Sequence, residues 1–304
     1  MIMPKLILVG LLWFACGVVH AQESTYTASK QVAIHFQEFG QGYPVLIVNG
    51  GPGFNSQGFS VVANKFAELG FKAILFDQRG TGQSTLPKVD RSTITMDLMV
   101  EDMEQIRRAL GVEKWIIFGH SFGGMLASYY TAKHPERVKA MVLSSSGGID
   151  LSLLTTAQEN IYARFSNAER DSLSLWRRQY SYENQLAARK KYNKLYARAY
   201  VYDTAHVSLI ADRLMEGDLH INRLVWNNLQ AIHYDCKVAL SQFCNPVLII
   251  QGKQDLIPIG LALKADSVLC RSTVTILNEC GHYGWVDQPD EYWLTIADFL
   301  NEIS

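Results

Sequence analysis

The stretch Ile116–Tyr130, IIFGHSFGGMLASYY, decides the fold and raises the first question about chemistry. It begins as an apolar, β-rich run, passes through Gly-His-Ser-Phe-Gly and continues with the apolar spacing of a helix. A serine between glycines at such a turn is either an incidental turn residue or a nucleophile held above the end of a sheet. The second interpretation explains the glycines, because neighbours without a Cβ let the strand and the helix approach closely. We therefore predict that Ser121 is a nucleophile.

Strands and helices alternate on both sides of this turn. Continuous apolar runs, typical of strands buried on both faces of a parallel sheet, recur at Val45–Val48, Ala73–Phe76, Trp115–Phe118, Ala140–Leu143, Val247–Ile250 and Val274–Leu277. Apolar residues with a period near 3.6 predict helices at Gln57–Leu69, Thr95–Leu110, Met125–His134, Leu261–Leu269 and Glu291–Ile303. The alternation predicts an α/β fold with a mostly parallel sheet, and Gln31–Phe39 is a candidate antiparallel edge.

The pattern changes between residues 150 and 235. This part of the sequence is rich in Ala, Leu, Arg, Lys and Tyr, contains no apolar run typical of a buried strand, and is typical of helices. We therefore predict a helical cap at 150–235, inserted into an α/β core that occupies residues 22–149 and 236–304.

Residues 1–21 differ again in composition. They contain one Lys, an apolar run over Leu6–Val19 and the small-residue site Val19-His20-Ala21. This pattern predicts a secretory signal peptide that is cut after Ala21, and therefore a secreted or periplasmic protein. The alternative is an uncleaved membrane anchor, but the apolar run is shorter than the roughly 20 residues that a spanning helix needs. No stable membrane span is expected after cleavage.

Net charge and the positions of the cysteines narrow the possible classes of function further. The 304 residues carry a net charge of −1, which gives no basic face for a nucleic acid. Without Cys16, the cysteines are Cys236, Cys244, Cys270 and Cys280. Disulfides over the short loops, Cys236–Cys244 and Cys270–Cys280, are one expectation, and four buried free thiols are the other. The spacing of a zinc site is missing, so neither a metal nor an organic cofactor is expected.

A serine hydroxyl needs a general base, and the strand-to-helix turn predicts the chain order serine, acid, histidine. His282, in ECGHYGW, follows the last strand on a core loop, so we predict that it is the base. Asp255, in IIQGKQDLIP, follows the preceding strand and is predicted to orient the imidazole. Asp150 is the alternative acid. A structural alternative for Asp255 is the N-cap of a helix.

An oxyanion would need backbone donors, and VNGGPGFNS follows the first buried strand. Its glycines allow backbone N–H groups to face an open space, while Pro52 stiffens the turn. We predict that the N–H groups of Gly51 and Phe122 form the oxyanion hole. An ordinary glycine turn is the alternative.

These pieces together resemble the α/β-hydrolase superfamily, and within it the proline iminopeptidase, or serine aminopeptidase, branch. The matching motifs are Gly50–Gly53 (GGPG), Asp77–Ser84 (DQRGTGQS), Gly119–Gly124 (GHSFGG) and Gly281-His282, and the resemblance spans about residues 30–148 and 236–304. Within the second motif, Asp77 and Arg79 are expected to make structural hydrogen bonds.

The resemblance implies a serine hydrolase that acts through an acyl-enzyme on small peptides with a free N-terminus. Enzymes of that branch resemble one another in holding the substrate's α-amino group with carboxylates near the cap, for which Glu183, Glu216 and Asp218 are the candidates here. Asn49 stands where the branch usually has His before the first loop glycine. The alternatives are a carboxylesterase or carbon–carbon bond hydrolase of small molecules, and a non-catalytic receptor that binds a small ligand under the cap.

Overall fold

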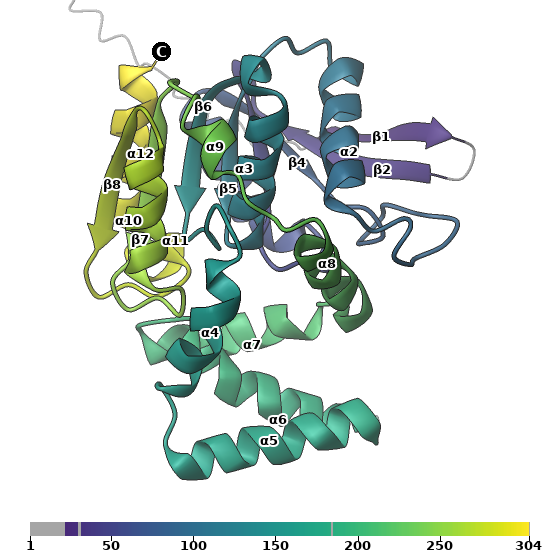
Figure 1. The fold of residues 1–304 in the computed structure, drawn as a ribbon, viewed down its shortest axis with the longest axis vertical. Helices are drawn as coiled ribbons and strands as arrows, with labels where there is room; N and C mark the ends of the chain where they lie inside the picture. Colours follow the sequence, from purple (N-terminus) through teal and green to yellow (C-terminus); the bar gives the residue numbers. More distant parts are fainter. Residues whose placement is uncertain (1–21, 30–31, 184, 304) are drawn as a thin grey trace, which may run out of the picture.

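The computed structural model describes residues 22–29, 32–183 and 185–303, so the predicted signal peptide lies outside the described residues. Within this part of the chain, eight strands form one sheet in the order β1-β2-β4-β3-β5-β6-β7-β8 (Figure 1). The strands are β1 (Gln22–Ser29), β2 (Val32–Phe39), β3 (Tyr43–Val48), β4 (Phe71–Phe76), β5 (Trp115–His120), β6 (Val138–Ser144), β7 (Val247–Gly252) and β8 (Ser272–Leu277).

The sheet is mostly parallel, which confirms the predicted fold class. Every pair from β4 and β3 across to β8 is parallel, whereas β2 pairs antiparallel with both β4 and β1. The predicted edge at Gln31–Phe39 corresponds to β2 and is antiparallel as expected, but it is not the edge, because β1 lies outside it. The sequence of β1, QESTYTAS, lacks an apolar run, so no buried-strand pattern indicated it.

Helices cover both faces of the sheet. Those of the core are η1 (Gln57–Phe59), α1 (Ser60–Glu68), α2 (Met96–Ala109), α3 (Phe122–Lys133), η2 (Pro135–Arg137), α9 (Lys237–Leu240), α10 (Ile259–Val268), α11 (Gly284–Asp287) and α12 (Pro289–Glu302). Alternate residues of a strand point to opposite faces. Ile74 and Ile117 accordingly pack in one buried apolar cluster with α2 and α3, and Ala73 and Ile116 pack in another with α1 and α12.

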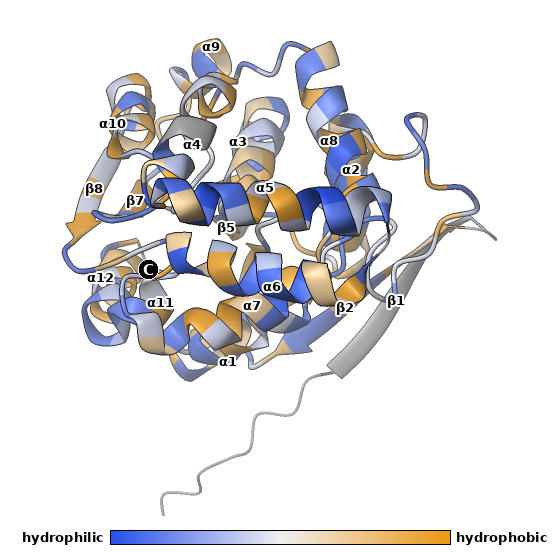
Figure 2. Cartoon of the chain, turned by 90° about the horizontal axis from the view of Figure 1, so that it is seen from below, coloured by the Kyte–Doolittle hydropathy of each residue, from blue (hydrophilic) through white to orange (hydrophobic). Residues whose placement is uncertain are grey.

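A helical segment leaves the sheet after β6 and returns before β7. It comprises α4 (Ser152–Tyr162), α5 (Asn167–Tyr182), α6 (Leu186–Tyr196), η3 (Ala197–Ala199), η4 (Thr204–His206), α7 (Val207–Met215) and α8 (Leu219–Ala231). In Figure 1, α5 and α6 lie farthest from the sheet, and Figure 2 shows that most residues of α5 are hydrophilic, with hydrophobic ones in between. None of the helices in the described ranges is both long and apolar enough to cross a membrane.

The two ends of this helical segment meet at the core. Asp150 and Asp235 form an isolated antiparallel bridge, and the Cys236 N–H donates to the Ile149 carbonyl at 2.8 Å. The chain therefore leaves and re-enters the core at one place.

The disulfide expectation needs a correction. Cys244 is bonded to Cys270, with their Cα atoms 4.8 Å apart, whereas Cys236 and Cys280 are buried free thiols. The reason is strand pairing: Cys244 and Cys270 immediately precede β7 and β8, whose first residues Val247 and Ser272 are partners in the parallel register. Both short-loop pairings were wrong because the sheet, not the sequence separation, brings these sulfurs together.

Candidate active site

Ser121 occupies the turn between β5 and α3 in a strained backbone conformation, with φ 55° and ψ −122°. A positive φ is uncommon for a residue with a side chain and is found at functional turns. The flanking glycines are required by close approach, since a Cβ on Gly123 would lie 2.0 Å from the Val48 carbonyl oxygen, and one on Gly119 would lie 2.5 Å from the Gly123 carbonyl oxygen. Helix α3 begins at Phe122, three residues before the predicted start, directly after the serine.

His282 and Asp255 are in direct contact. His282 Nδ1 lies 2.8 Å from Asp255 Oδ1, and both residues are buried. The Ile257 N–H also donates to Oδ1 at 2.9 Å, and Gln251 Nε2 donates to Oδ2 at 2.7 Å. Asp255 is not the N-cap of α10, because that position belongs to Pro258. The carboxylate is thus fixed by three donors in a buried site.

Asp150, the alternative acid, belongs to a different group of charges. Lys237 Nζ donates to its Oδ2 at 2.9 Å, and Lys264 Nζ donates to the same oxygen. Burial alone would raise the pKa of the Asp150 carboxyl, but hydrogen bonds from Lys264, Ser152 and Lys237 hold that pKa well below its usual value. The structure joins Asp255, rather than Asp150, to His282.

Ser121 and His282 line the same small pocket, of about 60 Å³. Gly51 lines it too, in a left-handed conformation with φ 72°. Phe122 is the first residue of α3, so its N–H has no acceptor within the helix. Both residues predicted to supply oxyanion donors therefore flank Ser121.

The glycine loop that carries Gly51 is held by side-chain amides. Asn49 Nδ2 donates to the carbonyl oxygens of Gly50 at 3.2 Å and Phe54 at 3.3 Å, and Gln78 Nε2 donates to the Asn49 carbonyl at 2.9 Å. Asn49, where the resemblance would place His, thus closes the loop upon itself.

Asp77 and Arg79 make the structural hydrogen bonds that the sequence predicts. The Ser56 N–H and hydroxyl donate to Asp77 Oδ1 at 2.8 Å and 2.9 Å. Arg79 makes a two-pronged ion pair with Asp102, at 2.7 Å and 2.6 Å, in which both residues are buried. These contacts tie the DQRGTGQS segment to the glycine loop and to α2.

His120 packs beside the turn that carries Ser121. It is 1% exposed, and its ring centroid lies 4.6 Å from that of His282. Burial, and then the charge that His282 can carry, lower the pKa of His120 well below its usual value. The side chain is therefore a neutral neighbour of His282.

Two contacts from the helical segment were not foreseen. The Tyr200 carbonyl accepts the His282 N–H at 2.7 Å, and Arg164 donates to the carbonyl oxygens of Asp255 and, at 3.2 Å, of Ala199. Neither residue stands in a motif, so the sequence carries no signal for them. Gln251, by contrast, could have been recognised from the sequence, because it is a single polar residue near the end of a buried apolar strand.

The three candidate carboxylates of the cap are not gathered around Ser121. Glu183 is exposed and accepts from Gln185, while Glu216 is exposed and pairs with Arg213. Asp218 lines a cavity of the cap, but its carboxylate caps the N-terminus of α8. No carboxylate lines the Ser121 pocket among the residues described, whereas Arg213 does.

Comparison with known proteins agrees with this architecture. The sequence matches the alpha/beta hydrolase fold family over residues 43–289, and the chain belongs to that family. It is 28% identical over 287 residues to a proline iminopeptidase of Heyndrickxia coagulans, an alignment that covers 88% of this chain and 94% of that protein.

Two other proteins also resemble this chain along most of its length. A 2-hydroxy-6-oxononadienedioate/2-hydroxy-6-oxononatrienedioate hydrolase of Escherichia coli is 27% identical over 288 residues, with 90% of this chain and 92% of that protein covered. The structure of an esterase from Exiguobacterium antarcticum matches with a TM-score of 0.72 and 18% identity, over 91% of this chain and 99% of that one. The chain is thus an α/β hydrolase that resembles proline iminopeptidases and other hydrolases of this fold.

Proposed function

We propose that this protein is a serine hydrolase in which Ser121 is the nucleophile, His282 the general base and Asp255 the group that orients His282. One observation carries the proposal: Ser121 stands on a strained turn in the same pocket as His282, whose Nδ1 is 2.8 Å from Asp255 Oδ1. Because Asp255 holds Nδ1, His282 Nε2 is the nitrogen that takes the proton from the serine hydroxyl.

The reaction follows from these roles. Ser121 Oγ attacks the substrate carbonyl while its proton passes to His282, and the N–H groups of Gly51 and Phe122 stabilise the negative oxygen. The N-terminus of α3 also favours negative charge at this position. His282 then protonates the leaving group, and a water activated by the same imidazole releases the acid from the acyl-enzyme.

We favour a small carboxylic ester, or a carbon–carbon bond next to a carbonyl, as the group that is cleaved. A free α-amino group is a cation that needs a carboxylate partner when it leaves water. Glu183 and Asp218 are engaged elsewhere, and Glu216 is paired with Arg213. Among the described residues, Arg213 lines the Ser121 pocket and no carboxylate does. These observations support neutral or anionic substrates over cationic ones.

An aminopeptidase of the proline iminopeptidase kind, acting on short peptides, is the second candidate. Similarity to proline iminopeptidases along most of the chain supports it, together with the GGPG and DQRGTGQS motifs. A non-catalytic small-ligand receptor is disfavoured, because ligand binding alone does not require a strained serine in the same pocket as a histidine–carboxylate pair.

One set of assays separates these candidates. The purified protein is tested against p-nitrophenyl esters and against aminoacyl-arylamides with free and N-acetylated amines, with Ser121→Ala as the blank. We expect turnover of esters that is lost in the blank, and labelling of Ser121 by a fluorophosphonate. Efficient cleavage of free-amine arylamides alone would favour the aminopeptidase, and full activity in Ser121→Ala would refute the serine mechanism.

We also propose that the protein is exported and that its mature chain begins at Gln22. The Cys244–Cys270 disulfide supports this, because such bonds persist in oxidising compartments. Mass determination of the exported form tests it, and a chain that retains Met1 would contradict cleavage.

A further inference from the structure

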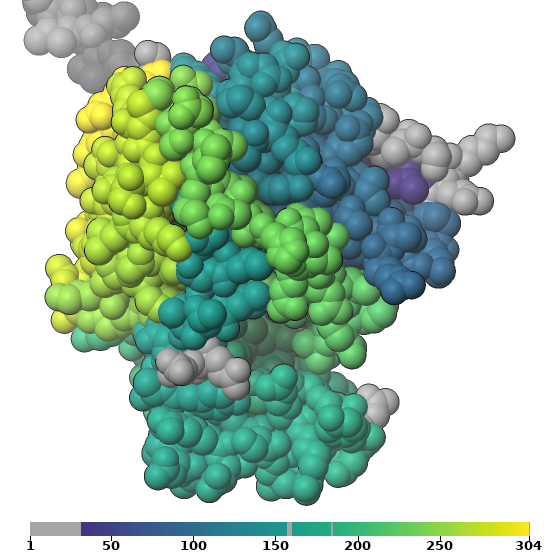
Figure 3. All heavy atoms as spheres, viewed as in Figure 1, coloured from purple at the N-terminus to yellow at the C-terminus, as the bar shows by residue number. Residues whose placement is uncertain are grey.

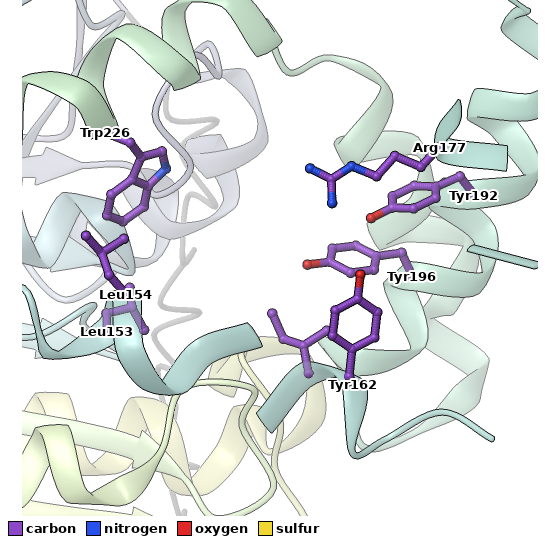
Figure 4. Close-up of a pocket in the computed structure, with 8 residues that line it drawn as sticks. Leu153, Leu154, Tyr162, Arg177, Tyr192, Tyr196 and Trp226 are labelled. Atoms are coloured by element: carbon purple, nitrogen blue, oxygen red, sulfur yellow. The ribbon is translucent and has the colours of Figure 1, made fainter. Parts of the chain in front are cut away.

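The cap contains a second cavity, of about 290 Å³, whose two walls differ in character. Leu153, Leu154 and Trp226 form an apolar wall, and Arg177, Tyr192 and Tyr196 form a polar one. Figure 4 shows the two walls facing each other, with the guanidinium and the tyrosine hydroxyls directed into the space between them. Figure 3 shows the surface hollowed between α8 and the α5–α6 pair.

Arg177 is the one charged side chain among the described residues that line this cavity, and within the described chain it has no hydrogen-bond or ion-pair partner. Two other arginines of the cap are engaged: Arg189 donates to the Gly217 carbonyl at 2.8 Å, and Arg213 pairs with Glu216. Burial raises the pKa of Tyr196 to about 12, so its phenol stays protonated and can donate a hydrogen bond. Among the described residues, the polar wall therefore offers donors and a positive charge without a counter-ion.

This cavity lies near the candidate active site, with one further cavity between them. An adjoining cavity shares Arg177, Tyr192 and Tyr196 with it, and shares Phe54, Tyr200 and Leu214 with the Ser121 pocket. On the opposite wall, Trp226 packs edge-on against Phe122, with ring centroids 6.4 Å apart. Residues that line the cavities therefore form a continuous series from Ser121 to Arg177.

We propose that the Arg177 cavity binds a carboxylate on the acyl part of the substrate, remote from the scissile carbonyl. The inference rests on the proposed serine hydrolase function. The guanidinium forms paired hydrogen bonds with a carboxylate, and the apolar wall accommodates the hydrocarbon between the two ends. The acyl part is assigned because Trp226, on the apolar wall of the cavity, packs against Phe122, the residue that directly follows the nucleophile.

The test compares mono-p-nitrophenyl esters of linear dicarboxylic acids with the same esters whose remote carboxylate is methylated. For the best chain length we expect kcat/KM roughly 10- to 100-fold higher with the free carboxylate, the range typical of a charged hydrogen bond. Arg177→Gln should remove this preference and leave turnover of the methylated ester unchanged. Arg178→Gln is the matched control, because Arg178 is the next residue of α5 and is exposed like Arg177 but does not line the cavity, so this variant should keep the preference.

A preference retained in Arg177→Gln, or no preference at any chain length, would overturn the inference. A preference found only when the carboxylate sits on the leaving group, as in acetyl esters of hydroxybenzoates, would overturn the assignment to the acyl part. As a readout that needs no turnover, the dicarboxylic monomethyl ester should bind to Ser121→Ala and bind at least roughly tenfold more weakly after Arg177→Gln is added. The proposed function fails separately, through esters that Ser121→Ala still hydrolyses.

Discussion

Asp255 holds His282 through Oδ1 at 2.8 Å while its other oxygen, Oδ2, accepts from Gln251 at 2.7 Å. The carboxylate is therefore fixed on both sides, and it cannot rotate away from the imidazole without losing a donor. This arrangement presents His282 with a constant acceptor at Nδ1, which sets the tautomer that a general base needs.

Asp255→Asn should lower kcat roughly 10³–10⁴-fold, because an amide at this position disturbs the tautomer while keeping the shape. Kinetics on the best ester substrate measures it. Asp150→Asn is the matched control, since Asp150 binds Lys237 and Lys264 instead of His282. Its folded fraction should keep nearly normal kcat. A larger loss of kcat in Asp150→Asn would mean that the acid is wrongly assigned.

Arg164→Gln should lower kcat roughly 10- to 100-fold with a smaller change in KM, because Arg164 positions the Asp255 loop by donating to its backbone carbonyl. The side chain touches the loop rather than the Ser121 pocket. Steady-state kinetics and a melting curve on each variant separate this effect from instability. Arg178→Gln, on the exposed side of α5, should match the parent in both, and an equal loss of kcat there would refute a specific role.

The Cys244–Cys270 disulfide closes a loop of 26 residues in sequence separation. In the chain-entropy description, its removal should lower the free energy of unfolding by about 3.5 kcal/mol. Denaturation of a Cys244→Ala/Cys270→Ala variant measures this. Thiol reductant should lower the melting temperature of the parent and leave that of the variant unchanged; sensitivity of the double variant to reductant would contradict the pairing.

His120 predicts how stability depends on pH. Burial and the neighbouring His282 hold its pKa in the folded state below the ordinary 6.5, so below that pH the unfolded chain binds more protons than the folded chain. This contribution to stability is present above about pH 6.5 and is lost as the pH falls, with a slope of up to about 1.4 kcal/mol per pH unit. Urea denaturation between neutral and mildly acidic pH should show a shallower slope for His120→Gln than for the parent.

The control for that experiment is His206→Gln, at the partly exposed end of η4. It should reproduce the parental pH slope. If both variants have that slope, His120 is not the group responsible.

Much of the core could be predicted because its signals are local. Apolar runs such as Val247–Ile250 predict a strand, and the glycines around Ser121 predict a tight turn, from only a few residues each. The fold class predicted from them is confirmed. The polar β1 gave no such pattern, and the bond between Cys244 and Cys270 depends on a strand register that no short segment contains.

In the candidate site, too, some residues could be predicted from local sequence and others could not. Ser121, Asp255 and His282 could be proposed from motif and chain order, because each follows a recognisable strand. Arg164 and Tyr200 could not, because they act through backbone contacts between segments far apart in sequence. The direction of the Arg177 side chain into a cavity likewise depends on how α5 packs on its neighbours.

The bridge between Asp150 and Asp235 bears on how such an enzyme can change over evolutionary time. Because the chain leaves and re-enters the core at neighbouring positions, the cap can lengthen, shorten or be exchanged without displacing any strand of the sheet. In this protein the cap also supports the candidate active site, since the Tyr200 carbonyl and Arg164 hold the loops that carry His282 and Asp255. A transplanted cap must therefore bring its own equivalents of these two contacts, so new specificity and retained turnover have to be inherited together.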